Sequence, residues 1–148
     1  MTDRLDDIIA RMQIREVIDK YAVYLDSGDF QNLPSVFSED ATYNIIPDPG
    51  ILPLPLTGRK TICAALEDRY HEVQKTAQRR HLMTNVVIDD LTETSARSRT
   101  FLTVLSIPKS GKPAELRGTG IYVDGFVRID NRWMISERVL HVDVLTGS

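Results

Sequence analysis

The chain has 148 residues, the usual length of one domain, and we expect residues 1–148 to form a single domain. Its formal net charge of −3 is too acidic for a general binder of phosphate backbones, so we expect no nucleic-acid partner. Apolar residues make up 42% of the chain and charged residues 26%, which is typical of a globular protein and not of a disordered one.

Cysteine usage and hydropathy indicate the compartment. Cys63 is the single cysteine, so the sequence offers neither an internal disulfide nor a CxxC site. No apolar run approaches the roughly 20 residues that a membrane span needs. The first residues, MTDRLDDIIARM, carry acids where a signal peptide has basic residues. We therefore expect a cytoplasmic protein without a membrane partner.

The first half of the chain predicts helices. A long helix that ends near Gly28 is indicated by apolar residues at spacings of three and four: Leu5, Ile8, Ile9, Met12, Val17, Ile18, Tyr21, Ala22 and Leu25. A short helix should span Phe30–Phe37, with Asp29 as its cap. Another should span residues 59–74, with Ile62, Leu66, Tyr70 and Val73 on one side.

A strand over Ala41–Ile46 and a proline-rich loop lie between these helices. The loop reads PDPGILPLPLTG and holds four prolines and two glycines, so we expect no regular structure in it. Its apolar residues should either pack under the domain or border a pocket mouth.

The second half of the chain predicts strands, at His81–Ile88, Thr94–Ile107, Leu116–Ile129 and Arg132–Val144. The turn between the last two falls at Asp130-Asn131, residues that tolerate a left-handed backbone. Strict alternation in the first strand would place Leu82, Thr84, Val86 and Ile88 on one face and His81, Met83, Asn85 and Val87 on the other. Helices followed by antiparallel strands indicate the α+β class.

Familiar catalytic signatures for nucleotide binding, zinc hydrolysis and serine hydrolysis are absent, which leaves a few single residues. His71 lies among charged residues and fits a solvated helix position. His81 opens an otherwise apolar strand and is either a hydrogen-bonded core residue or a functional histidine. His141 either lines a pocket or lies at a sheet edge.

Three further residues are candidates. Asp26 lies at a helix end, where the helix dipole disfavours an acid, so it is either a turn residue or a functional one. Tyr21, five residues earlier, lies about 140° away around an ideal helix, and the two would converge only if the helix unwinds before Asp26. Arg138, in an apolar strand, needs a partner, a ligand or an exposed sheet face.

Together these segments resemble the SnoaL-like branch of the NTF2-like superfamily. The similarity covers nearly the whole chain and is greatest to scytalone dehydratase, hexachlorocyclohexane dehydrochlorinase and bile acid dehydratase. It rests on RMQIREVIDKYAVYLDSGDFQNLPSVFSEDATY, on RRHLMTNVVI and on the closing hairpin GFVRIDNRWMISERV. The resemblance implies an α+β cone, in which N-terminal helices pack on a curved, mostly antiparallel sheet and enclose an apolar pocket.

The resemblance also implies roles for particular residues. His81 would be the general base, Asp26 its orienting carboxylate, Tyr21 a hydrogen-bond donor to the substrate and Arg138 a pocket arginine. We further expect Tyr43, Met83, Leu102 and His141 to contact the substrate. These roles imply a cofactor-independent lyase, a dehydratase or dehydrohalogenase, that acts on a small, cyclic, mostly apolar molecule without a metal.

The sequence departs from its relatives in one strand. Scytalone dehydratase has a second catalytic histidine, for which SRTFLTVLS offers no equivalent, and bile acid dehydratase has an acid where this chain has Thr103 and Val104. We therefore expect a different substrate. An isomerase, a cyclase, a non-catalytic binding protein and the small subunit of a ring-hydroxylating dioxygenase are the alternatives. Members of the superfamily commonly associate through the outer face of the sheet, so we expect a homodimer or homotrimer.

Overall fold

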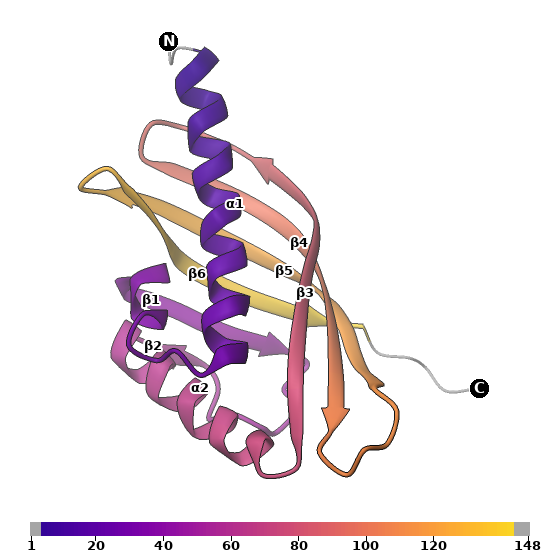
Figure 1. The fold of residues 1–148 in the computed structure, drawn as a ribbon. Coiled ribbons are helices and arrows are strands. Elements are labelled where there is room, and N and C mark those ends of the chain that lie inside the picture. The colour runs from indigo at the N-terminus through magenta and orange to yellow at the C-terminus, as the bar shows by residue number, and fades with distance from the viewer. Residues whose placement is uncertain (1–3, 144–148) are drawn as a thin grey trace.

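A computed structural model describes residues 4–143 and has the predicted α+β architecture. The elements in chain order are α1 (Arg4–Ser27), η1 (Leu33–Val36), β1 (Phe37–Ile46), β2 (Leu56–Thr57), α2 (Arg59–Gln74), β3 (Ala77–Asp89), β4 (Ser95–Pro108), β5 (Glu115–Ile129) and β6 (Arg132–Val142). Figure 1 shows α1 crossing the long strands and α2 lying beside β1 at the other end of the sheet. Within residues 4–143, neither helix has the length and hydropathy needed to cross a membrane.

One six-stranded sheet has the order β2-β1-β6-β5-β4-β3. All neighbouring pairs are antiparallel except β1 and β6, which run parallel. The predicted turn at Asp130-Asn131 is confirmed, because both residues have positive φ, at 50° and 60°. The predicted end of the last strand, Val144, lies outside the described residues. Because β3 to β6 form consecutive hairpins, the site depends on how side chains alternate along them.

The C-terminus of α1 is fixed by a Schellman motif. Gly28 has a φ of +72°, its N–H donates to the carbonyl of Leu25, and the N–H of Asp29 donates to the carbonyl of Tyr24. A Cβ at Gly28 would lie 2.6 Å from the Tyr70 hydroxyl oxygen of α2, so this position also needs glycine for close packing. The predicted helix end is therefore confirmed, and it places Asp26 in the last turn.

The N-terminal half of α1 is less buried than its periodicity predicted. Ile14, Ile18, Tyr21, Ala22 and Leu25 pack into the core. Four apolar residues that we expected on the buried face are instead 42–66% exposed: Leu5, Ile8, Ile9 and Met12. The reason is geometric, since the start of α1 extends past the edge of the sheet (Figure 1).

Two short segments differ from the sequence prediction. The helix expected over Phe30–Phe37 is the four-residue 3₁₀ turn η1, which has Pro34 in its first turn, and the strand after it begins at Phe37 and not at Ala41. The proline-rich loop is mostly irregular, as expected, but it ends in the short strand β2, where Leu56 pairs with Tyr43. The helix predicted over residues 59–74 is confirmed as α2.

The predicted alternation along β3 is wrong beyond Thr84. Asn85 has a φ of +54°, and the pairing of β3 with β4 shifts register between Thr84 and Val87. Such a bulge adds one residue to one strand and turns the following side chains to the opposite face. Val86 and Ile88 therefore pack on the same core as Met83, whereas Val87 is 49% exposed.

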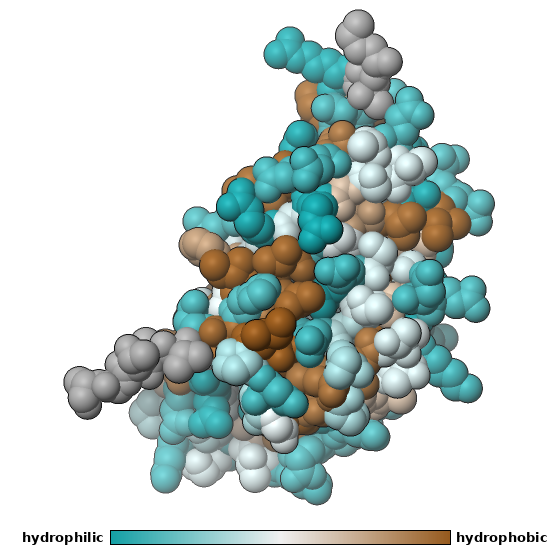
Figure 2. All heavy atoms as spheres, turned by 180° about the vertical axis from the view of Figure 1, so that it is seen from behind, coloured by the Kyte–Doolittle hydropathy of each residue, from teal (hydrophilic) through white to brown (hydrophobic). Residues whose placement is uncertain are grey.

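The outer face of the sheet carries a row of apolar residues. Cross-strand pairing aligns Ile121 with Phe101 on one side and with His141 on the other, and His141 is paired with Ile46 at the far edge. Phe101 and Ile46 are 49% and 47% exposed. Figure 2 shows apolar side chains gathered over the middle of the face opposite the helices. This row, Phe101–Ile121–His141–Ile46, is called the outer row below.

A fully buried ion pair lies on the inner face of β5 and β6. Arg138 donates from Nε and Nη2 to the two carboxylate oxygens of Asp124, at 2.9 and 2.8 Å. Its guanidinium carbon lies 4.2 Å from the ring centres of both Tyr21 and Tyr122. Burial by itself lowers the pKa of Arg138, but the charge and hydrogen bonds of Asp124 outweigh burial and raise that pKa above its ordinary value. The guanidinium is therefore a permanent cation in the core.

Because each charge of this pair compensates the other, we predict that Asp124→Asn lowers the free energy of unfolding by about 3–5 kcal/mol. The matched control is Asp89→Asn, which removes the carboxylate of the exposed cross-strand pair Asp89–Arg99. That substitution should cost less than about 1 kcal/mol, because exposed pairs contribute little. Urea denaturation of the three proteins measures both values, and equal losses would contradict a stabilising role for the buried pair.

Candidate functional site

A cavity of about 140 Å³ lies between the two helices and the inner face of the sheet. Apolar side chains form most of its wall: Leu25, Ile45, Ile51, Leu52, Leu66, Val73, Leu102, Val104 and Leu140. Polar side chains come from α1, α2 and the strands: Tyr21, Asp26, Tyr43, Arg69, Tyr70, Gln74, Gln78, Arg79, His81 and Tyr122. Ile51 and Leu52 belong to the proline-rich loop, which therefore borders the cavity, one of the two positions that the sequence left open.

Asp26 and His81 are in direct contact inside this cavity. The Nδ1 atom of His81 lies 2.6 Å from Oδ1 of Asp26, and the backbone N–H of His81 donates to Oδ2 at 2.7 Å. The side chain of His81 is 15% exposed and that of Asp26 is 9% exposed. Because an ionised carboxylate only accepts hydrogen bonds, this contact selects the tautomer with the proton on Nδ1 and leaves Nε2 as an acceptor.

A further hydrogen bond holds the end of α1 against β3. The side-chain amide of Gln78 donates to the carbonyl oxygen of Asp26 at 2.8 Å, and its own oxygen accepts from Gln74 of α2 at 2.9 Å. We expected Tyr21 and Asp26 to converge only if the helix unwound before Asp26. Instead, α1 stays helical to Ser27, and both side chains still line the cavity. Tyr21 and Leu25 reach the cavity along one helix face, and Asp26 reaches it from the end of the last turn.

Three tyrosines form the wall on the sheet side of the cavity. The hydroxyl oxygens of Tyr21 and Tyr43 are 3.2 Å apart, and Tyr21 packs edge-on against Tyr122, with ring centres separated by 6.1 Å. Burial raises the pKa of Tyr21 and of Tyr122 well above the ordinary value, and the neighbouring tyrosines raise it further. Tyr21 and Tyr122 therefore stay protonated through neutral pH and can donate hydrogen bonds to an oxygen atom in the cavity.

Arg138 does not line the cavity, contrary to the sequence expectation. Its side chain lies on the inner face, but its guanidinium is held behind the rings of Tyr21 and Tyr122 by Asp124. The sequence analysis missed Asp124. The predicted two-residue hairpin would pair Asp124 with Glu137, and a register shift between Gly125 and Phe126 pairs it with Arg138. Arg138 therefore supports the tyrosines and does not contact a ligand in the cavity.

The four expected substrate contacts divide into two pairs. Tyr43 and Leu102 line the cavity. Met83 does not line it, because its side chain packs with the core on the inner face of β3. His141 lies on the outer face, because Leu140 takes the inward position of the alternation. The structure thus brings Tyr21, Asp26 and His81 together with Tyr43 and Leu102.

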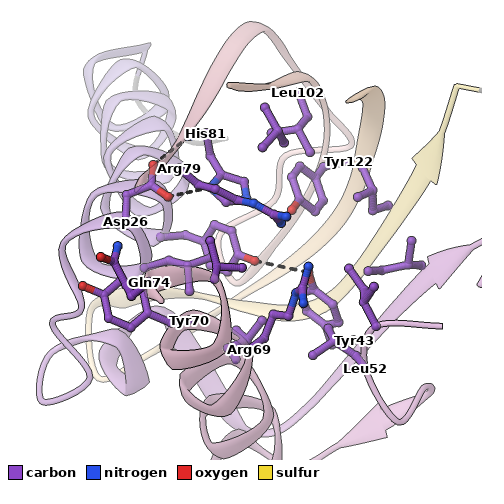
Figure 3. Close-up of a pocket in the computed structure, with 18 of the residues that line it drawn as sticks. Asp26, Tyr43, Leu52, Arg69, Tyr70, Gln74, Arg79, His81, Leu102 and Tyr122 are labelled. Carbon is purple, nitrogen blue, oxygen red and sulfur yellow. Dashed lines mark hydrogen bonds and ion pairs between the residues drawn. The ribbon is translucent and has the colours of Figure 1, made fainter. Parts of the chain in front are cut away.

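Two arginines that the sequence analysis did not single out also line the cavity. Arg69 comes from α2 and Arg79 from β3 (Figure 3). Arg79 lies two residues before His81, so strand alternation alone would have placed both side chains on one face. Arg69 lies within one helical turn of Leu66 and Val73, which were predicted to face inward. Among residues 4–143, no three His, Cys, Asp or Glu side chains gather closely enough to hold a metal ion.

Comparison with solved structures shows the same fold in several proteins. An NTF2-like protein with a cystatin-like fold from Novosphingobium aromaticivorans matches with a TM-score of 0.82 and 23% identity, over 98% of this chain and 88% of its own. A proposed scytalone dehydratase from the same species matches at 0.75 and 22%, over 93% and 87%. Rv3472 of Mycobacterium tuberculosis, a protein of unknown function, matches at 0.77 and 21%, over 97% and 78%.

No curated protein is similar enough in sequence to serve as a relative. The sequence model of the SnoaL-like domain, however, matches residues 6–139, a span that holds both helices and nearly the whole sheet. The order of elements, the cavity and this match agree with the resemblance noted from the sequence. The chain belongs to the SnoaL-like family.

Proposed function

We propose that this protein is a cofactor-independent lyase that removes water or halide by β-elimination from a small, cyclic, mostly apolar substrate. The observation that carries the proposal is the contact of 2.6 Å between Nδ1 of His81 and Oδ1 of Asp26 at the wall of an apolar cavity. A histidine held in this tautomer presents a free Nε2, which is what a general base requires.

The chemistry assigned to each group follows from its position. Nε2 of His81 takes a proton from the carbon next to a carbonyl group, and the electron pair of that C–H bond forms an enolate. Tyr21 and Tyr43 donate hydrogen bonds to the enolate oxygen. The electrons then form the C=C bond and expel hydroxide, which takes the proton back from His81 and leaves as water. A halide leaves as the ion, and the proton passes to solvent.

Asp26 has two roles in this scheme. Its carboxylate fixes the ring orientation, and it stabilises the imidazolium that exists between the two proton transfers. A surface hollow lined by Ala22, Ser27, Arg80 and other residues also has Asp26 and His81 in its wall. This hollow offers a path by which the imidazolium exchanges its proton with water in the halide reaction.

The rival proposals place different demands on the same residues. A non-catalytic binding protein or a dioxygenase small subunit has no need for a carboxylate that orients a histidine inside a cavity, and the Asp26–His81 contact therefore favours an enzyme. The same base and donors also suit a double-bond shift or a ring closure. We place elimination first because the resemblance to dehydratases extends through Tyr21, Asp26 and His81, and the resemblance to a dehydrochlorinase extends through Asp26 and His81.

The test begins with a screen of cyclic β-hydroxyketones and halogenated rings for elimination. On a substrate that is turned over, His81→Ala should lower kcat/KM by about 10²–10⁴-fold or more, because the base is lost. Asp26→Asn should be nearly as damaging, because an amide can present the wrong group to Nδ1. Tyr21→Phe should cost less, about 10²–10³-fold, because it removes one donor.

The matched control is His71→Ala, which removes an exposed histidine from α2 and should leave kcat/KM unchanged. Circular dichroism of each variant confirms that it is folded. The proposal is wrong if folded His81→Ala retains most of the activity. It is also wrong if Tyr21→Phe is more damaging than Asp26→Asn, since the tyrosine would then be the centre of the reaction.

We also propose that the protein forms a homodimer or homotrimer through the outer face of the sheet. An antiparallel sheet that packs on one side normally exposes polar residues on the other. Here the outer row instead presents Phe101, Ile121 and Ile46, which together with His141 between the last two form a largely apolar surface of the kind that marks protein association. A second copy of the chain offers the same row and is therefore a complementary partner.

Phe101→Glu should convert this assembly to a monomer, because it places a charge on an exposed apolar side chain of the outer row. Met12→Glu is the control, since Met12 is also exposed, at 66%, but lies on α1. Light scattering coupled to size exclusion at micromolar concentration reports the mass of each protein. A monomeric wild type would refute the assembly, and dissociation by Met12→Glu alone would place the contact on the helix.

A further inference from the structure

The cavity contains two cationic side chains that the elimination scheme does not use. Arg69 reaches it from α2 and Arg79 from β3, and Figure 3 shows both guanidinium groups directed toward the middle of the cavity. Both side chains are half-buried, and the Nε atom of each is buried without a hydrogen-bond partner in the part of the chain that the structure describes. A buried donor without a partner is costly, and a ligand that accepts from it removes that cost.

Two of the nearby carboxylates are engaged elsewhere. Asp26 accepts two hydrogen bonds from His81, and Glu72, which borders the surface hollows beside Arg69, pairs with Lys75. Within residues 4–143, no carboxylate forms an ion pair with Arg69 or Arg79. The pKa of Arg79 is lowered, first by burial and then by the positive charges of Arg69 and Arg117, with Asp26 acting in the opposite direction. The two guanidinium groups therefore repel each other and lack a dedicated counterion.

The same two arginines also face the solvent side. They border a surface hollow whose other charged residues are Lys112, Arg117, Glu72 and Glu115, so basic residues outnumber acidic ones there. On a protein with a net charge of −3, such a local excess of positive charge attracts anions toward Arg69 and Arg79. These two arginines thus line both the basic hollow and the apolar cavity.

We propose that the ligand of this cavity is an apolar one-ring carboxylate whose carboxylate group binds between Arg69 and Arg79. Guanidinium groups bind carboxylates through paired, charge-assisted hydrogen bonds, which suits a half-buried arginine pair. The apolar interior of about 140 Å³ suits one six-membered ring, since a cavity of about 150 Å³ holds benzene. The inference uses the proposed function only in taking this cavity as the substrate site.

The geometry also limits where the anion lies relative to the base. Arg79 and His81 are two residues apart on the same face of β3, which is about 6.6 Å along a strand. The anion site and the base therefore share one wall of the cavity. A one-ring ligand held by its carboxylate presents to His81 a carbon within a few bonds of that carboxylate.

The experiment compares two probes that differ in charge and little in shape, 4-ethylbenzoate and 4-ethylbenzyl alcohol. Heteronuclear NMR titration of the full chain gives the Kd of each. We expect the wild type to bind the benzoate at least about 10-fold more tightly than the alcohol, as charge-assisted hydrogen bonds to a carboxylate require. Arg69→Gln and Arg79→Gln should each remove most of this preference and leave binding of the alcohol unchanged.

The matched control is Arg80→Gln, which removes the same charge one residue further along β3, where Arg80 is exposed and does not line the main cavity. It should change the Kd of the benzoate by less than about two-fold, as expected for an exposed charge. Acetate should bind far more weakly than the benzoate, because it lacks the ring. The proposal is overturned by equal binding of benzoate and alcohol, by no measurable binding of benzoate, or by an equal effect of Arg80→Gln.

A separate arm distinguishes this inference from the proposed reaction. His81→Ala should keep the preference for the benzoate, because His81 is not assigned to the anion. If that preference is found and no elimination is detected, the anion site stands and the lyase proposal fails. If elimination is detected but the wild type shows no preference for the benzoate, the reaction stands and the anion site fails.

Discussion

The carboxylate of Asp26 is the constraint on which the site depends. It lies in the last turn of α1, where the negative end of the helix dipole disfavours an acid. Two N–H groups of His81, one from the backbone and one from the ring, compensate for that unfavourable position. The same two bonds join the end of α1 to β3 and fix the tautomer of the histidine. The position of α1 and the proposed reactivity thus depend on one contact, and we expect a change at Asp26 to affect both.

The Asp124–Arg138 pair supports the opposite wall of the cavity. Arg138 lies against the rings of both Tyr21 and Tyr122, so it supports the tyrosines without lining the cavity. Burial and mutual repulsion keep the hydroxyls of these tyrosines protonated. The cavity therefore has the imidazole of His81 on β3 and protonated tyrosine hydroxyls from α1 and β5. That arrangement suits a reaction in which a proton leaves carbon while charge develops on oxygen.

Much of this arrangement could be predicted from the sequence, because local signals determine it. Gly28 marked the end of α1, and the proline-rich loop marked the segment before the start of α2. The apolar periodicity of residues 59–74 predicted α2 with its bounds. The family resemblance placed Asp26 and His81 together, which neither residue alone indicated. The errors arose where one residue changes a register. The bulge at Asn85 reverses the faces of Val86 and Ile88, and periodicity carries no sign of it.

Other features escaped because they depend on tertiary packing. The exposure of the first turns of α1 follows from the extent of the sheet beneath it, which the helix's own sequence does not encode. The ion pair of Arg138 needed the register shift between Gly125 and Phe126. Arg69 and Arg79 were not among the candidates because a sequence does not distinguish a half-buried arginine from an exposed one. Only the structure shows which guanidinium groups lack a partner.

The central claim is that Asp26 holds His81 with its proton on Nδ1 and leaves Nε2 free to act as a base. Long-range ¹H–¹⁵N NMR of the neutral imidazole rings tests it directly. We predict that His81 shows one tautomer, protonated on Nδ1, and that Asp26→Asn abolishes this selection, whereas the exposed His71 shows averaged signals in both proteins. A His81 ring protonated on Nε2 in the wild type would contradict the account, because the nitrogen assigned as the base would already carry a proton.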